Sequence, residues 1–176
     1  AFDSLKSAPS ITITNNKEST YSRRASPPFT TDALLQAAGS RWSSWTPKKT
    51  MRVAADLYNA GHITYIRTDS TRTNGASRDS IKKLIEEKWG ADHIGSGVMG
   101  KKNTNAQDAH EAIRPTRPDS LEPQGLAGDE LQLYRLIWAR FAASQMTKSE
   151  YQRRSLTTEV AGFSKTLTGT YSWRTH

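Results

Sequence analysis

The feature that most restricts the fold is a change of pattern along the chain, because helical periodicity is confined to its middle. Both ends lack that period and are rich in threonine and β-branched residues, as at Ile11–Thr14 and Thr166–Tyr171. A helical middle between strand-like ends predicts one domain inserted into another. We place the boundaries so that 1–26 and 151–176 are strand segments of the outer domain and 27–150 is the helical domain.

Capping signals and apolar spacing predict four or five helices in the middle. Thr46-Pro47 combines a capping residue with proline at the first helical position, and Gly61 ends the apolar stripe that follows. Asp129 is the expected cap of the last helix. The expected helices are Thr31–Gly39, Thr46–Gly61, Ser77–Trp89, Asn105–Ile113 and Asp129–Ala143. The predicted fold class is mainly α, a compact helical bundle with short β segments at both ends.

Composition narrows the classes of partner. The 176 residues carry 25 Lys and Arg against 17 Asp and Glu, a formal charge of +8, which favours an anionic partner. Six basic residues against two acidic ones lie between Arg41 and Arg72. The chain has no cysteine, which excludes disulfides, thiol catalysis and cysteine zinc sites. Apolar runs of a few residues are too short for a membrane span, which needs about 20.

The segment Gly61–Ser70 places a tyrosine two residues before an arginine amid further cations. Residues two apart on an extended segment point to one side, so Tyr65 and Arg67 could face one phosphate together. Arginine suits this contact because its planar fork donates two hydrogen bonds to phosphate oxygens. A packed tyrosine beside a surface arginine is the alternative interpretation.

Two further segments could contribute to a site. In Gln107–Thr116, His110-Glu111 begins like a zinc-peptidase helix, but Arg114 stands where that motif needs its second histidine, which excludes this chemistry. His110 could instead contact phosphate or carry a proton. Cations follow the predicted helix start at Thr46-Pro47, where backbone amides could also meet a phosphate; they are Lys48, Lys49 and Arg52.

These motifs, in this order and spacing, resemble those of the type IA DNA topoisomerases, and bacterial topoisomerase I in particular. The resemblance runs from about Pro27 to Met146. It rests most on the blocks Ile63–Ser70 and Ala109–Thr116, and also on Pro27–Thr31, Lys49–Arg52, Leu57-Tyr58, Leu136–Trp138 and Ala143–Met146. It implies that the helical middle is the winged-helix-like tyrosine domain of the family and that the flanking strands belong to the arch domain.

The resemblance also implies a mechanism. Tyr65 would attack a DNA phosphodiester and hold the 5′ phosphate as a phosphotyrosine ester, with Arg67 on the scissile phosphate. The implied supporting and phosphate-binding residues are His110, Arg114, Thr64, Asp69, Lys48, Lys49 and Arg52. The family's acidic metal cluster has no counterpart here, so Mg²⁺ would bind a domain absent from this sequence, and no metal site is expected within it.

The implied substrate is DNA, preferably single-stranded, and the implied setting is the nucleoid of a bacterial cytoplasm, without a membrane. The chain would work with the remaining topoisomerase domains and be inactive alone. One alternative is a non-catalytic single-stranded DNA-binding module in which Tyr65, Trp42 and Trp45 only stack on bases. Another is a helix-turn-helix regulator, which short helices and basic charge would also suit.

Overall fold

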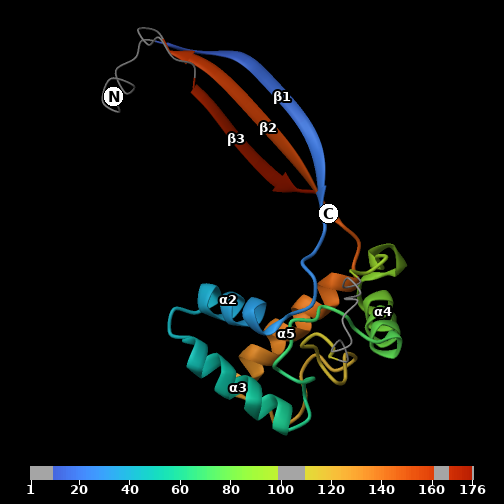
Figure 1. Ribbon diagram of the computed structural model, residues 1–176. Coiled ribbons are helices and arrows are strands. Elements are labelled where there is room, and N and C mark those ends of the chain that lie inside the picture. The colour runs from blue at the N-terminus through green and yellow to red at the C-terminus, as the bar shows by residue number, and fades with distance from the viewer. Residues whose placement is uncertain (1–9, 99–109, 161–166, 176) are drawn as a thin grey trace. The chain divides into compact units, whose positions relative to one another are not determined.

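The computed structural model describes residues 10–98, 110–160 and 167–175. Contacts divide them into two compact units (Figure 1). The helical unit is Arg24–Thr147, and the sheet unit is formed by the segments before Arg24 and after Thr147. Each boundary between the two units therefore lies three residues before the boundary placed from the sequence.

The sheet unit is a three-stranded antiparallel sheet in the order β1-β2-β3. Its strands are β1 (Ile11–Arg23), β2 (Ser149–Val160) and β3 (Leu167–Arg174). Tyr21 lies directly opposite Tyr151, and Tyr151 lies opposite Arg174, which fixes the register at one end. A register shift interrupts β1 between Ile13 and Asn15.

This sheet corrects the predicted fold class, because the protein is a mixed α/β chain and not mainly α. Its strands contain 13, 12 and 8 residues, so they are not short end pieces. The polar run Asn15–Ser26 lacks the alternation that marks Ile11–Thr14, so the sequence predicts that the strand leads into a loop there, yet the first part of this run continues β1 to Arg23. Ladder hydrogen bonds form whatever the side chains are, and a strand exposed on both faces lacks the alternation that would reveal it.

The helical unit contains four α-helices among its described residues. They are α2 (Thr31–Arg41), α3 (Pro47–Asn59), α4 (Gly75–Trp89) and α5 (Gly128–Gln145), with a short 3₁₀ turn, η1 (Ala91–His93). Side chains cap three of them as the chemistry of N-caps requires, since Thr30, Thr46 and Asn74 accept from the backbone N–H three residues later. The helices predicted over Thr31–Gly39, Thr46–Gly61 and Ser77–Trp89 are confirmed.

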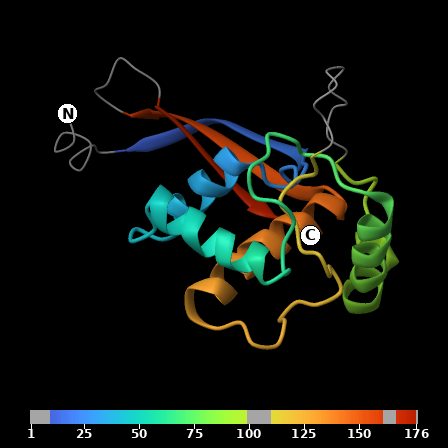
Figure 2. The same ribbon diagram turned by 60° about the horizontal axis from the view of Figure 1, so that its bottom comes forward.

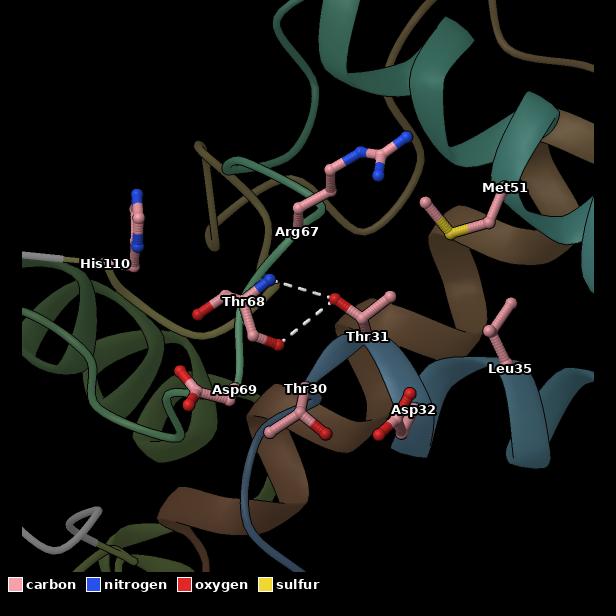
Figure 3. Close-up of a pocket in the computed structure, with 9 residues that line it drawn as sticks. All are labelled: Thr30, Thr31, Asp32, Leu35, Met51, Arg67, Thr68, Asp69 and His110. Carbon is pink, nitrogen blue, oxygen red and sulfur yellow. Dashed lines mark hydrogen bonds between the residues drawn. The ribbon is translucent and has the colours of Figure 1, made fainter. Parts of the chain in front are cut away.

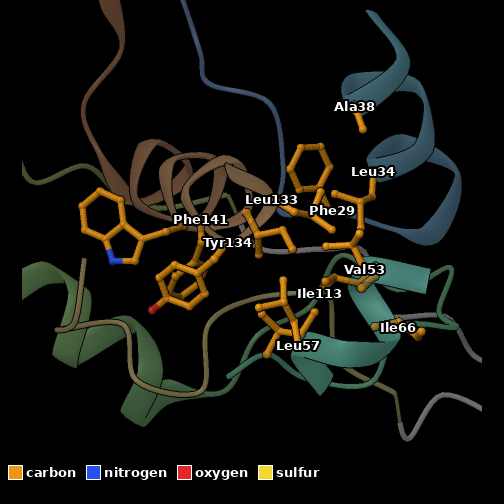
Figure 4. Close-up of a cluster of buried hydrophobic side chains, with 14 of the residues drawn as sticks. Phe29, Leu34, Ala38, Val53, Leu57, Ile66, Ile113, Leu133, Tyr134 and Phe141 are labelled. Carbon is orange, nitrogen blue, oxygen red and sulfur yellow. The ribbon is translucent and has the colours of Figure 1, made fainter. Parts of the chain in front are cut away.

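Helix α5 is the centre of this unit and contacts α2, α3 and α4 (Figures 1 and 2). Its stripe of Leu133, Tyr134, Ile137 and Phe141 is at most 1% exposed. Facing it are side chains from the other elements, namely Phe29, Leu34, Val53, Leu57 and Ile113 (Figure 4). Burying a large apolar side chain stabilises a fold by about 1.5–3 kcal/mol, so this cluster holds the elements that carry the site.

Two local predictions were wrong. Of the helix expected over Asn105–Ile113, residues 105–109 lie outside the described residues, and 110–113 is extended, with Ile113 bridged to Phe29. Asp129 does not cap α5, because the cap position is Ala127 and Asp129 lies in the first turn. Within the described ranges, no helix is long and apolar enough to cross a bilayer.

Candidate nucleophile site

The backbone on either side of Tyr65 is fixed by two partners that are distant in sequence. On one side, the Thr64 N–H donates to the Arg114 carbonyl at 2.9 Å and the Thr116 N–H donates to the His62 carbonyl at 3.0 Å. On the other side, Thr31 donates its N–H to the Thr68 carbonyl at 2.9 Å. The segment 61–70 turns at its start and bends at Ile66 and Arg67, and it is anchored at both ends without being a strand of the sheet.

Two threonine hydroxyls complete this anchoring. Thr64 Oγ1 donates to the Ala112 carbonyl at 2.7 Å and accepts from the Arg114 N–H at 3.0 Å. Thr31 Oγ1 donates to the Ile66 carbonyl at 2.7 Å. It also accepts from the Thr68 N–H at 2.9 Å (Figure 3). Thr64, predicted as a supporting residue, thus acts on the backbone beside Tyr65.

The ring of Tyr65 remains accessible on this fixed segment. Its neighbours Ile63 and Ile66 are 1% and 7% exposed, whereas Tyr65 is 42% exposed. The Tyr65 ring packs between two other rings, edge-on to Tyr58 at 5.5 Å and tilted against His110 at 5.7 Å between centroids. The structure thus brings His110, which is 45 positions away in sequence, to the side of Tyr65.

A cavity of about 820 Å³ opens beside this segment. Its lining includes Arg67, Asp69 and His110, three of the residues singled out in the sequence (Figure 3). The rest of the lining comes from the start of α2, from one residue of α3 and from the segment 61–70 itself, and consists of Thr30, Thr31, Asp32, Leu35, Met51 and Thr68. Arg67 supplies a guanidinium here, and His110 supplies an imidazole.

The cavity also contains residues that sequence reasoning did not assign to a site. Thr30, Thr31 and Met51 entered the sequence analysis only within the blocks Pro27–Thr31 and Lys49–Arg52 of the family resemblance. Tyr58 was noted only within the resemblance and the helix stripe, although it is 41% exposed and touches Tyr65. A signal was present for Tyr58, because an aromatic residue at the exposed end of an amphipathic helix, seven residues before Tyr65, is well placed to pack on it.

Arg114 occupies a different position from that expected of a phosphate ligand. It is 6% exposed, and its guanidinium forms an ion pair with Glu111 and donates to the Pro115 carbonyl at 2.9 Å. Its side chain is therefore bound within its own segment, 110–116. Since that segment pairs with the backbone at Thr64, Arg114 stabilises the backbone next to Tyr65 and does not line the cavity.

The three cations at the start of α3 do not line the cavity. Lys49 forms a 2.8 Å ion pair with Asp129 and lies 4.8 Å from the centroid of the Trp45 ring. Lys48 and Arg52 are exposed. The structure therefore groups Tyr65, Arg67, Asp69 and His110 and leaves these cations on the neighbouring helix.

A second cavity, of about 560 Å³, is lined by His62, Arg117 and Tyr134 among other residues. The Tyr134 hydroxyl donates to the Ser120 carbonyl at 2.6 Å. Burial, with a smaller contribution from the charge of Asp119, raises the pKa of Tyr134 to about 12. This hydroxyl therefore stays protonated near neutral pH and serves to hold the loop before α5.

Two of the rings invoked by the stacking alternative pack on each other. The Trp42 and Trp45 centroids are 4.6 Å apart, and Trp45 is only 5% exposed. A base needs an open ring face, so Trp45 is not available to one.

In the described residues, no group of three or more His, Asp or Glu side chains could hold a metal ion. These residues therefore do not fit Mg²⁺.

Comparison with known proteins gives one consistent family. A model of the DNA topoisomerase family matches residues 1–174. The chain is 38% identical over 167 residues to DNA topoisomerase 1 of Pseudomonas aeruginosa, covering 93% of this chain and 19% of that protein. It is 43% identical over 126 residues to a prokaryotic-type DNA topoisomerase 1 of Acanthamoeba polyphaga mimivirus, covering 70% of this chain and 15% of that protein.

The structural comparison agrees. Full-length topoisomerase I of Thermotoga maritima superposes with a TM-score of 0.80 at 30% identity, covering 98% of this chain and 29% of that one. The chain thus spans less than a third of the length of these relatives.

Proposed function

Because this chain belongs to the DNA topoisomerase family, as its motifs indicated, we propose that it is the tyrosine-bearing region of a type IA enzyme. The enzyme relaxes negatively supercoiled DNA by cutting one strand, passing another through the break and resealing it. One observation carries the proposal. Tyr65 is partly exposed on a segment anchored at both ends, beside a cavity lined by Arg67 and His110.

The proposed reaction is a reversible exchange of phosphodiesters. The Tyr65 oxygen bonds to phosphorus while the bond from phosphorus to the 3′ oxygen breaks. The phenol loses its proton, and the departing 3′ oxygen takes one up. The product is a 5′ phosphotyrosine ester and a free 3′ hydroxyl. Because no water enters, the bond energy is kept and the hydroxyl can attack the ester to reseal the strand.

The surrounding residues have distinct roles in this proposal. Arg67 donates two hydrogen bonds to oxygens of the scissile phosphate, where negative charge develops in the transition state. His110 lies against the Tyr65 ring and can donate to the same phosphate or relay a proton. Thr64 and Arg114 act as positioning residues, because their hydrogen bonds fix the backbone at Tyr65.

Other parts of the enzyme are needed to complete the site. Since the described residues do not fit a metal ion, any magnesium is bound elsewhere, and no step assigned here passes through it. The substrate is the single-stranded part of DNA, because only an unpaired strand can enter and pass. A bacterial cell would hold this enzyme in the cytoplasm, on its nucleoid.

The test is covalent trapping in a full-length topoisomerase that contains this region. We expect Tyr65→Phe to abolish the denaturant-resistant adduct with a labelled single strand while leaving affinity for DNA within about twofold, because one hydroxyl is lost and the ring contacts remain.

The matched variant is Tyr58→Phe, since Tyr58 is equally exposed and touches the same ring. It should still yield adduct. An adduct that survives Tyr65→Phe but disappears in Tyr58→Phe would show that the nucleophile is Tyr58 and that its assignment to Tyr65 is wrong.

A further inference from the structure

One face of the sheet unit carries positive charge at the end where the three strands are fully paired. Alternation along the strands puts Lys17, Arg23, Arg153 and Arg174 on this face. Over the paired stretches 17–23, 149–155 and 170–174, no acidic residue shares it. Glu159, on the same side of β2, lies four residues beyond Ser155 toward the other end of the sheet.

Aromatic rings lie among these cations. Tyr21 and Tyr151 face each other across β1 and β2, with centroids 5.3 Å apart and planes 14° from parallel. The Arg153 guanidinium lies 4.6 Å from the centroid of the Tyr21 ring. The Tyr21 hydroxyl donates to Ser172 Oγ at 3.3 Å. This hydrogen bond lowers the pKa of Tyr21, as do the neighbouring charges of Arg153 and Arg23.

The opposite face of the same strands differs in charge. It carries Arg154, whose guanidinium forms an ion pair with Glu18, and it also carries Glu150. This face also carries two stacked rings, Tyr171 and Trp173, with centroids 5.3 Å apart. Both faces therefore offer aromatic rings, and they differ in charge. This face has one arginine and two glutamates, whereas the first face has four cations and no acidic residue over the same stretch. We name the first surface, made of Lys17, Tyr21, Arg23, Tyr151, Arg153 and Arg174, the cationic sheet face.

We propose that the cationic sheet face binds single-stranded DNA, separately from the site at Tyr65. Six residue steps from Lys17 to Arg23 span about 20 Å, which is long enough for several consecutive phosphates. The cations contact the phosphates, and bases stack on the tyrosine pair and on the plane of Arg153. A single strand is required because the base faces in a duplex are already covered by their neighbours.

The test compares two adjacent arginines that differ in the face they occupy. Binding of the 176-residue chain to a fluorescent oligothymidine is measured by anisotropy at several salt concentrations. We expect Arg153→Gln to weaken binding about 3- to 10-fold and to reduce the salt slope by about 0.7, the value for one phosphate contact on a single strand. Arg154→Gln removes the same charge from the other face and should stay within about twofold.

The stacking part of the proposal has its own measurement. Tyr151→Leu should weaken binding about fivefold or more without changing the salt slope, because it removes a ring and no charge. Circular dichroism shows whether each variant keeps its sheet. If a variant loses its sheet, its binding measurement is replaced by crosslinking of the wild-type chain to an oligonucleotide that contains 5-iodouracil. The crosslink should map to Tyr21 or Tyr151.

Equal binding by the Arg153 and Arg154 variants would overturn the proposal, as would crosslinks confined to Arg24–Thr147. Equal affinity for duplex and single strands would overturn the stacking contact. None of these measurements involves cleavage, so their outcome is independent of the role assigned to Tyr65.

Discussion

Tyr65, Arg67 and Asp69 are exposed, while Ile66, Thr68 and Ser70 between and after them are buried. This alternation is that of an extended backbone, in which residues two apart share a side. That Tyr65 and Arg67 face one phosphate together stays a prediction, because both side chains are exposed but the chain bends at Ile66 and Arg67.

Replacing Arg67 by lysine keeps the charge but removes the planar fork. We expect Arg67→Lys to lower the rate of adduct formation about 10- to 100-fold, the size of one lost charged hydrogen bond in a reacting complex. The measurement is single-turnover cleavage of a labelled single strand by the full-length enzyme. Arg52→Lys, at an exposed position of α3 outside the cavity, should remain near the wild-type rate. A similar loss in both variants would refute the role of the fork.

Among the elements, the segment 110–116 shows how a buried ion pair supports a site without facing the substrate. We expect Arg114→Met to destabilise the chain by about 1–3 kcal/mol, because Glu111 and the Pro115 carbonyl lose their donor. The upper part of the usual range for buried pairs is excluded, since the Glu111 side chain is 31% exposed. Urea unfolding of the 176-residue chain gives the value.

The control for this change is Arg135→Met. Arg135 pairs with Glu122 at the surface, where both side chains are more than half exposed, so its loss should cost less than about 1 kcal/mol. If the two variants unfold at the same urea concentration, Arg114 does not stabilise the segment beside Tyr65.

The elements also show what the sequence could reveal and what it could not. Helix α3 was predictable because its signals are local: Thr46 caps it, Pro47 follows, and Gly61 adopts a φ of 75° just beyond its end. The length and pairing of the strands at the two ends were not predictable. β1 and β2 pair across more than a hundred residues, and their exposed side chains carry no alternation of polarity. Pairing between distant segments is decided by the tertiary fold.

The same distinction holds for the candidate site. The order of types in Gly61–Ser70 pointed to Tyr65 and Arg67, which share a short segment. The burial of Arg114 could not be predicted, because it follows from the pairing of its segment with the distant backbone at Phe29, His62 and Thr64. The contact of Tyr58 with Tyr65 could not be predicted either, because it depends on how α3 leads into the turn at Gly61.

For the chain in full, the net charge of +8 predicts weak binding that salt suppresses. The positive charge is spread over several segments, so about three to five phosphates are neutralised together, and log K should fall with log salt with a slope of about −2 to −4 for single strands. Titration of a fluorescent oligonucleotide between about 50 and 200 mM salt measures it. A flat response would remove the electrostatic account.

The 176 residues alone should form no covalent adduct, even with Mg²⁺ added. Arg67 and His110 cannot by themselves stabilise the departing 3′ oxygen, and the described residues hold no metal group. Denaturing electrophoresis after incubation with a labelled single strand is the measurement. Adduct in the wild-type chain, absent from its Tyr65→Phe variant, would mean that this region carries a complete catalytic site.

The assignment of Tyr65 can be read from the adduct itself. Trypsin cuts after Arg52 and Arg67, so the peptide Val53–Arg67 contains both Tyr58 and Tyr65 and no other tyrosine. Full-length enzyme is trapped on a single strand, treated with nuclease and trypsin, and this peptide is fragmented in a mass spectrometer. The residual nucleotide should be found on Tyr65. A nucleotide on Tyr58, or a trapped adduct whose label lies in another peptide, would contradict the account.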